Sequence, residues 1–215
     1  MEEGTVVAEA AEYGMLMHGF VGRSRVNGPG VRAVLYFQGC TLGCRCCWNA
    51  DTHSFVGEER TVGEVASLVQ RAHEEHSIDG IAFSGGEPMQ QAPDFLALVE
   101  LLHNQFPSLS FSMYSGYARP ELDGGFYWCR AQLRRAEKQA VWRTLQTHLD
   151  FAVLGRYVAS RPSILPLRTS TNQTLTLFSK RYCEEDFEQQ GFEIQIDAGG
   201  LVQVTGFPVA GLPIP

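Results

Sequence analysis

The strongest fold signal in the sequence is V-R-A-V-L-Y-F-Q, from Val31 to Gln38, which leads almost directly into C-T-L-G-C-R-C-C-W-N, from Cys40 to Asn49. The first stretch is rich in β-branched and aromatic residues, with G-P-G before it and Gly39 after it. This pattern is typical of a buried strand. We therefore expect a cysteine-rich loop at the end of a central strand.

Strand and helix patterns alternate downstream of this loop. Thr61-Val62-Gly63-Glu64 has the form of a capping box, which predicts a helix over Thr61 to His76. The other expected elements are strands at Ile78 to Phe83, Leu109 to Tyr114 and Phe151 to Leu154, and helices at Pro93 to Phe106 and Arg130 to His148. Such alternation indicates an α/β fold of parallel βαβ units, whose functional loops follow the carboxyl ends of the strands.

The C-terminal part shows a different pattern. Residues Phe192 to Ile196 and Leu201 to Val204 alternate between apolar and polar around Asp197 to Gly200, which predicts a β-hairpin. We expect a loosely ordered N-terminus at 1–13, a main domain at 14–185, and a hairpin extension at 186–215 packed on that domain.

Composition excludes several classes of protein. The chain has 17 Lys and Arg against 24 Asp and Glu, a formal charge of −7, and the basic residues form no long stripe. Nucleic-acid binding is therefore not expected. The apolar runs are much shorter than the roughly 20 residues of a membrane span, and the N-terminus lacks a secretion-signal pattern. We expect a cytoplasmic protein whose thiols stay reduced.

Four of the six cysteines, Cys40, Cys44, Cys46 and Cys47, fall within eight positions. Disulfides between them would close small strained loops, so metal ligation is the better interpretation. Three thiolates with the spacing of Cys40, Cys44 and Cys47 can be aimed at one point. A structural zinc site normally takes four ligands, and no second Cys-x-x-Cys or His-x-His pair follows. A [4Fe-4S] cluster held by three cysteines would leave one iron open.

Cys46 keeps other assignments possible. It could replace Cys47 in the triad, or act as the fourth ligand of a closed site. The isolated Cys129 and Cys183 are interpreted as small buried hydrophobic residues.

The cysteine stretch resembles the CxxxCxxC signature of radical S-adenosylmethionine enzymes, and F-S-G-G-E-P, from Phe83 to Pro88, resembles their GGE motif. V-N-G-P-G-V-R, from Val26 to Arg32, and L-R-T-S-T-N-Q, from Leu167 to Gln173, are similar to activating enzymes of glycyl radical enzymes. The likeness is to the type that activates anaerobic ribonucleotide reductases.

The resemblance implies an incomplete (β/α) barrel of the radical S-adenosylmethionine type. Its [4Fe-4S] cluster would be held by Cys40, Cys44 and Cys47, and S-adenosylmethionine would bind the fourth iron. The GGE motif would hold the methionine amino group. The residues implied in cofactor binding are Gly85, Gly86, Glu87, Ser115, Arg156, Asn172, Trp48 and Asn49.

Two positions depart from the family pattern. Cys46 stands where an aromatic residue often contacts adenine, and Leu154 stands where an acidic residue usually precedes the Gly-Arg pair.

The resemblance also implies an activity. An electron from a donor such as flavodoxin or ferredoxin would cleave S-adenosylmethionine to a 5′-deoxyadenosyl radical, which abstracts hydrogen from a glycine of a partner glycyl radical enzyme. One alternative is a radical S-adenosylmethionine enzyme acting directly on a small molecule or peptide. Another is a non-catalytic iron–sulfur or zinc protein in which Cys46 closes the site.

Overall fold

The structure, a computed structural model, describes residues 14–187, 191–196, 199–200 and 202–207. The N-terminal segment expected to be loose, 1–13, lies outside the described residues. The described part is built on one seven-stranded sheet with the strand order β3-β1-β2-β4-β5-β6-β7. In chain order the strands are β1 (Gly14–Ser24), β2 (Arg32–Phe37), β3 (Glu58–Thr61), β4 (Gly80–Gly85), β5 (Ser110–Ser115), β6 (Phe151–Leu154) and β7 (Thr174–Leu177).

The four central strands, β2, β4, β5 and β6, run parallel to one another, as the alternating pattern predicts. The remaining strands pair antiparallel, with β1 on β2, β3 on β1 and β7 on β6. The strand order is open, with β3 and β7 at its edges. The α/β prediction is thus confirmed as a mixed α/β fold with one large sheet, whereas the barrel is not confirmed.

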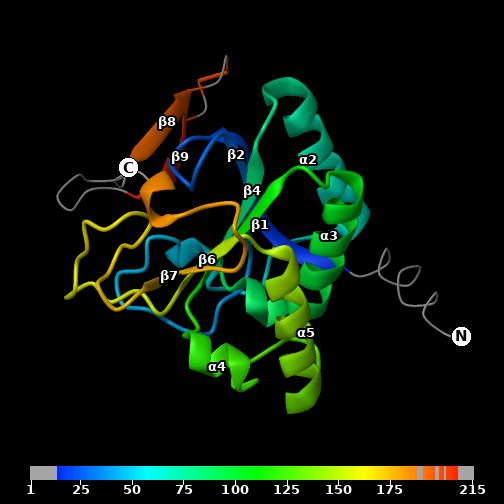
Figure 1. Ribbon diagram of the computed structural model, residues 1–215, viewed down its shortest axis with the longest axis vertical. Coiled ribbons are helices and arrows are strands. Elements are labelled where there is room, and N and C mark those ends of the chain that lie inside the picture. The colour runs from blue at the N-terminus through cyan, green and yellow to red at the C-terminus, as the bar shows by residue number, and fades with distance from the viewer. Residues whose placement is uncertain (1–13, 188–190, 197–198, 201, 208–215) are drawn as a thin grey trace, which may run out of the picture.

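Three helices, α2 (Val62–His76), α3 (Ala92–Gln105) and α5 (Arg135–His148), cover one face of the sheet (Figure 1). The alternation along β2 explains the two faces. Ala33, Leu35 and Phe37 belong to the core shared with the helices, whereas Val34 and Tyr36 point to the opposite face. The capping box of α2 is present, because Thr61 Oγ1 accepts from Glu64 N at 3.2 Å and Glu64 Oε2 accepts from Thr61 N at 2.8 Å.

Two sequence predictions differ from the structure. The helix expected from Arg130 begins at Arg135, because the backbone N–H of Arg130 donates to Gln90 O at 2.8 Å in a loop. Strands β1, β3 and β7 and the short helix α4 (Arg119–Asp123) were not expected. Short 3₁₀ turns complete the set: η2 (Ala50–Thr52), η3 (Pro88–Gln91) and η4 (Glu184–Asp186).

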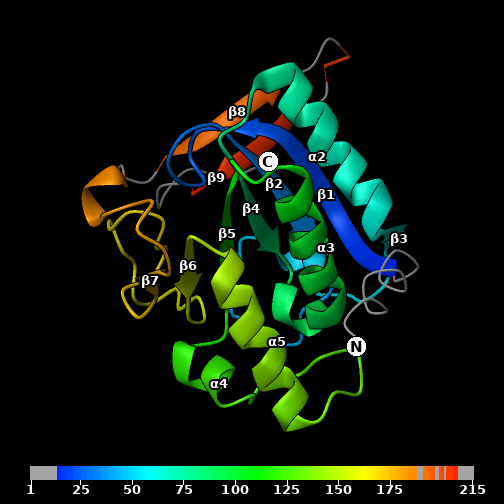
Figure 2. The ribbon, with the colours of Figure 1, turned by 45° about the vertical axis from the view of Figure 1, so that its right-hand side comes forward.

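The C-terminal hairpin is confirmed as β8 (Phe192–Ile196) paired antiparallel with β9 (Val202–Gly206), although part of its expected turn lies outside the described residues. The hairpin lies beside β1 on the side of the sheet away from the helices (Figures 1 and 2). Two polar contacts join the hairpin to β1 and the residue after it: Glu193 accepts from Arg25 N at 2.8 Å, and Gln203 donates to Phe20 O at 3.3 Å. No helix in the described part of the chain has the length and apolar character to cross a membrane.

Candidate cluster and cofactor site

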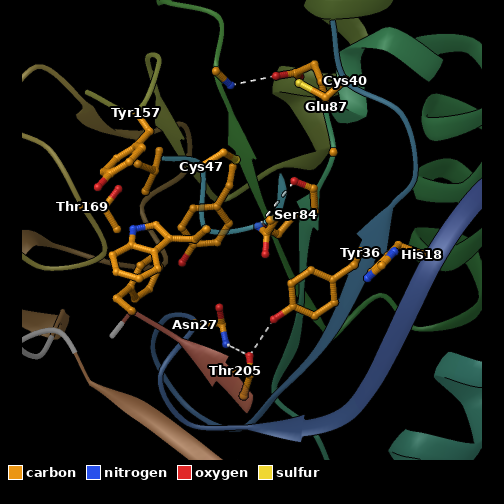
Figure 3. Close-up of a pocket in the computed structure, with 18 of the residues that line it drawn as sticks. His18, Asn27, Tyr36, Cys40, Cys47, Ser84, Glu87, Tyr157, Thr169 and Thr205 are labelled. Carbon is orange, nitrogen blue, oxygen red and sulfur yellow. Dashed lines mark hydrogen bonds between the residues drawn. The ribbon is translucent and has the colours of Figure 1, made fainter. Parts of the chain in front are cut away.

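A cavity of about 720 Å³ lies on the hairpin side of the sheet, at the carboxyl ends of the parallel strands (Figure 3). Nine residues expected at the site line it: Cys40, Cys44, Cys47, Trp48, Asn49, Gly85, Gly86, Glu87 and Ser115. Arg156 and Asn172 are not part of its lining. The structure thus brings together residues from the ends of β2, β4 and β5.

The cysteine loop, residues 40–47, leaves β2 and is fixed to the turn that follows it. Gly39 N donates to Thr52 O at 2.7 Å, and Cys40 N donates to His53 O at 3.1 Å. Cys46 adopts a left-handed backbone conformation with φ 58°. Its side chain is exposed and lies outside the cavity lining, in contrast to the other three cysteines of the loop.

The donor chemistry of the loop fits an iron–sulfur cluster. All six cysteines are free thiols. Burial raises the pKa of the Cys40 thiol to about 12 and also raises that of Cys47, so cluster binding must displace protons from both. Among the described residues, no three His, Cys, Asp or Glu side chains converge on a single metal ion. Each cysteine of a cubane cluster binds a different iron, so three thiols around one cavity suit a cluster.

The two glycines of the GGE motif are required by packing. Gly85 has φ 94°, and a Cβ there would come within 2.6 Å of Phe37 N. A Cβ on Gly86 would come within 2.4 Å of Gly39 O. Their small size therefore lets the GGE turn pack against the end of β2. Hydrogen bonds from Gly86 N to Phe37 O (2.8 Å) and from Glu87 N to Gly39 O (3.0 Å) fix that contact.

The carboxylate of Glu87 is buried and accepts three hydrogen bonds. The donors are Met89 N at 3.0 Å, the Ser115 hydroxyl at 2.8 Å and Gly116 N at 2.7 Å. Burial raises the pKa of Glu87 to about 7, and these three bonds oppose that rise. Glu87 therefore joins the ends of β4 and β5 beneath the cavity.

Arg156 and Asn172 lie together beside the site. Arg156 forms two hydrogen bonds to Glu121, at 2.7 and 2.9 Å, and its carbonyl oxygen accepts from Asn172 Nδ2 at 2.8 Å. Glu121 belongs to α4, so this helix supplies an acidic partner although Leu154 stands at the family's acidic position. The sequence pattern gave no signal for Glu121, because the pairing joins segments 35 residues apart.

The wall opposite the cysteines was not predicted as part of the site. Tyr36 OH lies 2.8 Å from Thr205 Oγ1, which also accepts from Asn27 Nδ2 at 2.8 Å (Figure 3). The hairpin thereby becomes a cavity wall. Asn27 stood in a recognised motif, but nothing in the sequence indicated Thr205. Trp48, expected at the site, pairs with Tyr157, another lining residue, at a ring separation of 6.2 Å.

Comparison with known proteins identifies the family of the chain. A family model described as a 4Fe-4S single cluster domain matches residues 26–176. The anaerobic ribonucleoside-triphosphate reductase-activating protein of Salmonella typhi is 33% identical over 106 residues, which are 46% of this chain and 66% of that protein. The protein of the same name from Vibrio cholerae is 28% identical over 159 residues, covering 72% of this chain and 92% of the relative.

A second class of relative is also similar. The pyruvate formate-lyase-activating enzyme of Clostridium pasteurianum is 40% identical over 83 residues, which are 37% of this chain and 34% of that enzyme. The matches thus span about two thirds of the Salmonella protein and one third of the Clostridium enzyme. They confirm the resemblance to activating enzymes that the motifs indicated.

Proposed function

Because the chain belongs to the family of 4Fe-4S single cluster domains, we propose that it is a radical S-adenosylmethionine enzyme that activates a glycyl radical enzyme. The observation that carries this proposal is the hydrogen bond from Glu87 N to Gly39 O, 3.0 Å long, which packs the GGE turn against the residue before Cys40. The two motifs therefore face one cavity. The names of the relatives support a glycyl radical enzyme as the partner.

Cys40, Cys44 and Cys47 would hold the cluster, and their side of the cavity leaves space for S-adenosylmethionine. When both groups are bound, they supply an electron and a carbon-centred radical that abstracts hydrogen. The electron donor would be a flavodoxin or ferredoxin. The chain's own task is to orient the cofactor and keep water from the reacting atoms.

The remaining predicted residues have proposed roles in cofactor binding. Gly85 and Gly86 would present backbone groups to the methionine end, and Glu87 and Ser115 would hold that turn rigid. Trp48 and Asn49 border the same cavity from the cysteine side. Arg156, fixed by Glu121, would place its positive charge near the cofactor. Asn172, which donates to the carbonyl oxygen of Arg156 at 2.8 Å, would position the backbone of that residue.

We also propose that residues 14–185 form the radical S-adenosylmethionine domain, as an incomplete barrel, and that 186–215 are an extension of it.

One observation favours the alternative of a small-molecule or peptide substrate. The hairpin residues from Val202 to Phe207 line the cavity and narrow it. Cys46 is exposed and lies outside the cavity. This position argues against the other alternative, a non-catalytic iron–sulfur or zinc protein in which Cys46 closes the site.

The partner can be tested directly. Neighbouring genes should encode a large protein with a C-terminal glycyl radical loop. We would mix the reconstituted chain with that glycyl radical protein, dithionite and S-adenosylmethionine. The mixture should give a glycyl radical signal in electron paramagnetic resonance (EPR) spectra. The Cys47→Ala variant is the control and should give none. If the wild type cleaves S-adenosylmethionine but forms no glycyl radical, the activase assignment is wrong and the direct-substrate alternative is favoured.

A further inference from the structure

Gln90 lies in η3, three residues after the GGE glutamate, and its side chain is completely buried. Every polar group of its amide is used. Gln90 Oε1 accepts from the backbone N–H of Thr41 at 2.9 Å, and Gln90 Nε2 donates to Thr41 Oγ1 at 2.7 Å and to Tyr117 OH at 2.9 Å. The amide therefore holds the cysteine loop through the backbone N–H and the hydroxyl of Thr41, the residue that follows Cys40.

The other end of this network lies in the segment 117–130, between β5 and α5. The Tyr117 hydroxyl accepts from Trp128 N at 3.0 Å, and the backbone carbonyl of Gln90 accepts from Arg130 N at 2.8 Å. Gln90 thus contacts this segment through its side chain and its backbone together. One buried residue connects the cysteine loop with a segment about eighty residues away in the chain.

We propose that Gln90 is a positioning residue that holds the cysteine loop in the geometry required by the cluster, and couples it to the segment 117–130. This deepens the proposed function and rests on it only for the identity of the cluster. Thr41 is itself exposed, so its hydrogen bonds to Gln90 rather than burial hold it in place. A buried amide that makes three hydrogen bonds is well suited to fix it, since each lost bond leaves a desolvated group unpaired.

Gln91 offers a matched control. It is equally buried and also uses its whole amide, but its partners are the backbone of β1, the backbone of Gln38 after β2, and the guanidinium of Arg130, which donates to Gln91 Oε1 at 3.4 Å. It accepts from Leu16 N at 2.7 Å and donates to Leu16 O at 3.0 Å and to Gln38 O at 2.9 Å. The two glutamines therefore differ mainly in whether their side chain contacts the cysteine loop.

The test compares Gln90→Met with Gln91→Met in the full chain after anaerobic reconstitution with iron and sulfide. Both substitutions remove a buried amide and keep its approximate volume, so both should lower thermal stability. For Gln90→Met we expect loss of cluster iron to an added chelator to be faster by on the order of tenfold, with a changed EPR spectrum of the reduced cluster. For Gln91→Met we expect cluster loss and spectrum close to those of the wild type.

Thr41→Val keeps the test decisive if Gln90→Met does not fold. This exposed substitution removes the Thr41 hydroxyl and leaves the Gln90 to Tyr117 bond, so it should accelerate cluster loss by a smaller factor. Equal cluster retention and spectra for Gln90→Met and Gln91→Met, or wild-type behaviour of Thr41→Val, would overturn the proposal. A wild type that holds its cluster but never cleaves S-adenosylmethionine contradicts the proposed function, while this comparison still reports on Gln90.

Discussion

Glu87 Oε2 accepts a hydrogen bond of 2.7 Å from the backbone N–H of Gly116, and this bond joins the end of β4 to the end of β5 at the cavity. Ser115 and Met89 donate to the other carboxylate oxygen. A carboxylate has about four acceptor positions, so three are already filled by the protein. Glu87 therefore braces the GGE turn, and we propose that the fourth position receives the ammonium group of the cofactor.

Glu87→Gln tests this bracing role. A neutral amide can keep the bonds from Met89 and Ser115, but its NH₂ group would then face the N–H of Gly116. We expect the free energy of unfolding to fall by about 1–3 kcal/mol, measured by chemical denaturation of the apo protein. Ser115→Ala removes a single donor and should lower the free energy of unfolding by less than Glu87→Gln does. Equal stability of Glu87→Gln and the wild type would show that the Gly116 bond does not contribute.

Gly85→Ala tests the packing explanation of the GGE motif. Its positive φ and the 2.6 Å approach of a Cβ to Phe37 N predict a loss of about 2–4 kcal/mol in the free energy of unfolding. Gly63→Ala is the control, because a Cβ in that helix meets nothing within 4 Å. It should stabilise the protein by up to about 1 kcal/mol. The explanation fails if the two substitutions have similar effects.

Asp94, in the first turn of α3, predicts a pH dependence of stability. Burial raises its pKa to about 6, above the value of about 3.9 in an unfolded chain. Its contribution to stability is therefore full below about pH 4 and is lost as pH rises through about 6. Asp94→Asn lacks this loss. Between pH 4 and pH 7, the free energy of unfolding of this variant should rise relative to that of the wild type, by about 1 kcal/mol after allowance for solvent screening.

Glu137→Gln provides a control of opposite sign for this pH series. Arg134 lowers the pKa of Glu137, so the stability that this group contributes is present at neutral pH and is lost as pH falls. Unfolding curves across the pH range should show opposite trends for the two variants. Parallel trends would contradict the assignment to Asp94.

Cys46 and Cys47 are neighbours with different environments, and this difference predicts different phenotypes. Cys46 is exposed outside the cavity, whereas Cys47 lines it. Cys46→Ala should keep the visible absorption and iron content of the reconstituted wild type, and Cys47→Ala should lose both. The reverse result would assign Cys46 to the cluster and exclude Cys47.

The sequence was sufficient for those elements whose pattern is local. The strand before Cys40 and the helix capped by Thr61 carry strong apolar periodicity or a capping signal, and both are present. Strand β1 has no such signal, because G-M-L-M-H-G-F-V-G-R-S combines three glycines with two methionines and is defined by pairing with β2 and β3. Arg130 was expected in a helix, but a tertiary bond to Gln90 holds it in a loop.

The site shows the same division between local and long-range information. The residues of the cysteine and GGE motifs come together because both motifs follow parallel strands that lie side by side. Glu121, Gln90 and Thr205 could not be identified, because each acts through partners distant in the chain. Chemistry at strand ends can be predicted from motifs, whereas the residues that support it depend on the packed fold.

The most direct test of the central claim is to add S-adenosylmethionine to the anaerobically reconstituted, dithionite-reduced chain. We expect the EPR spectrum of the reduced cluster to shift when S-adenosylmethionine binds, and 5′-deoxyadenosine and methionine to form in equal amounts. An unchanged spectrum without either product, in a chain that instead retains tightly bound zinc, would contradict the account.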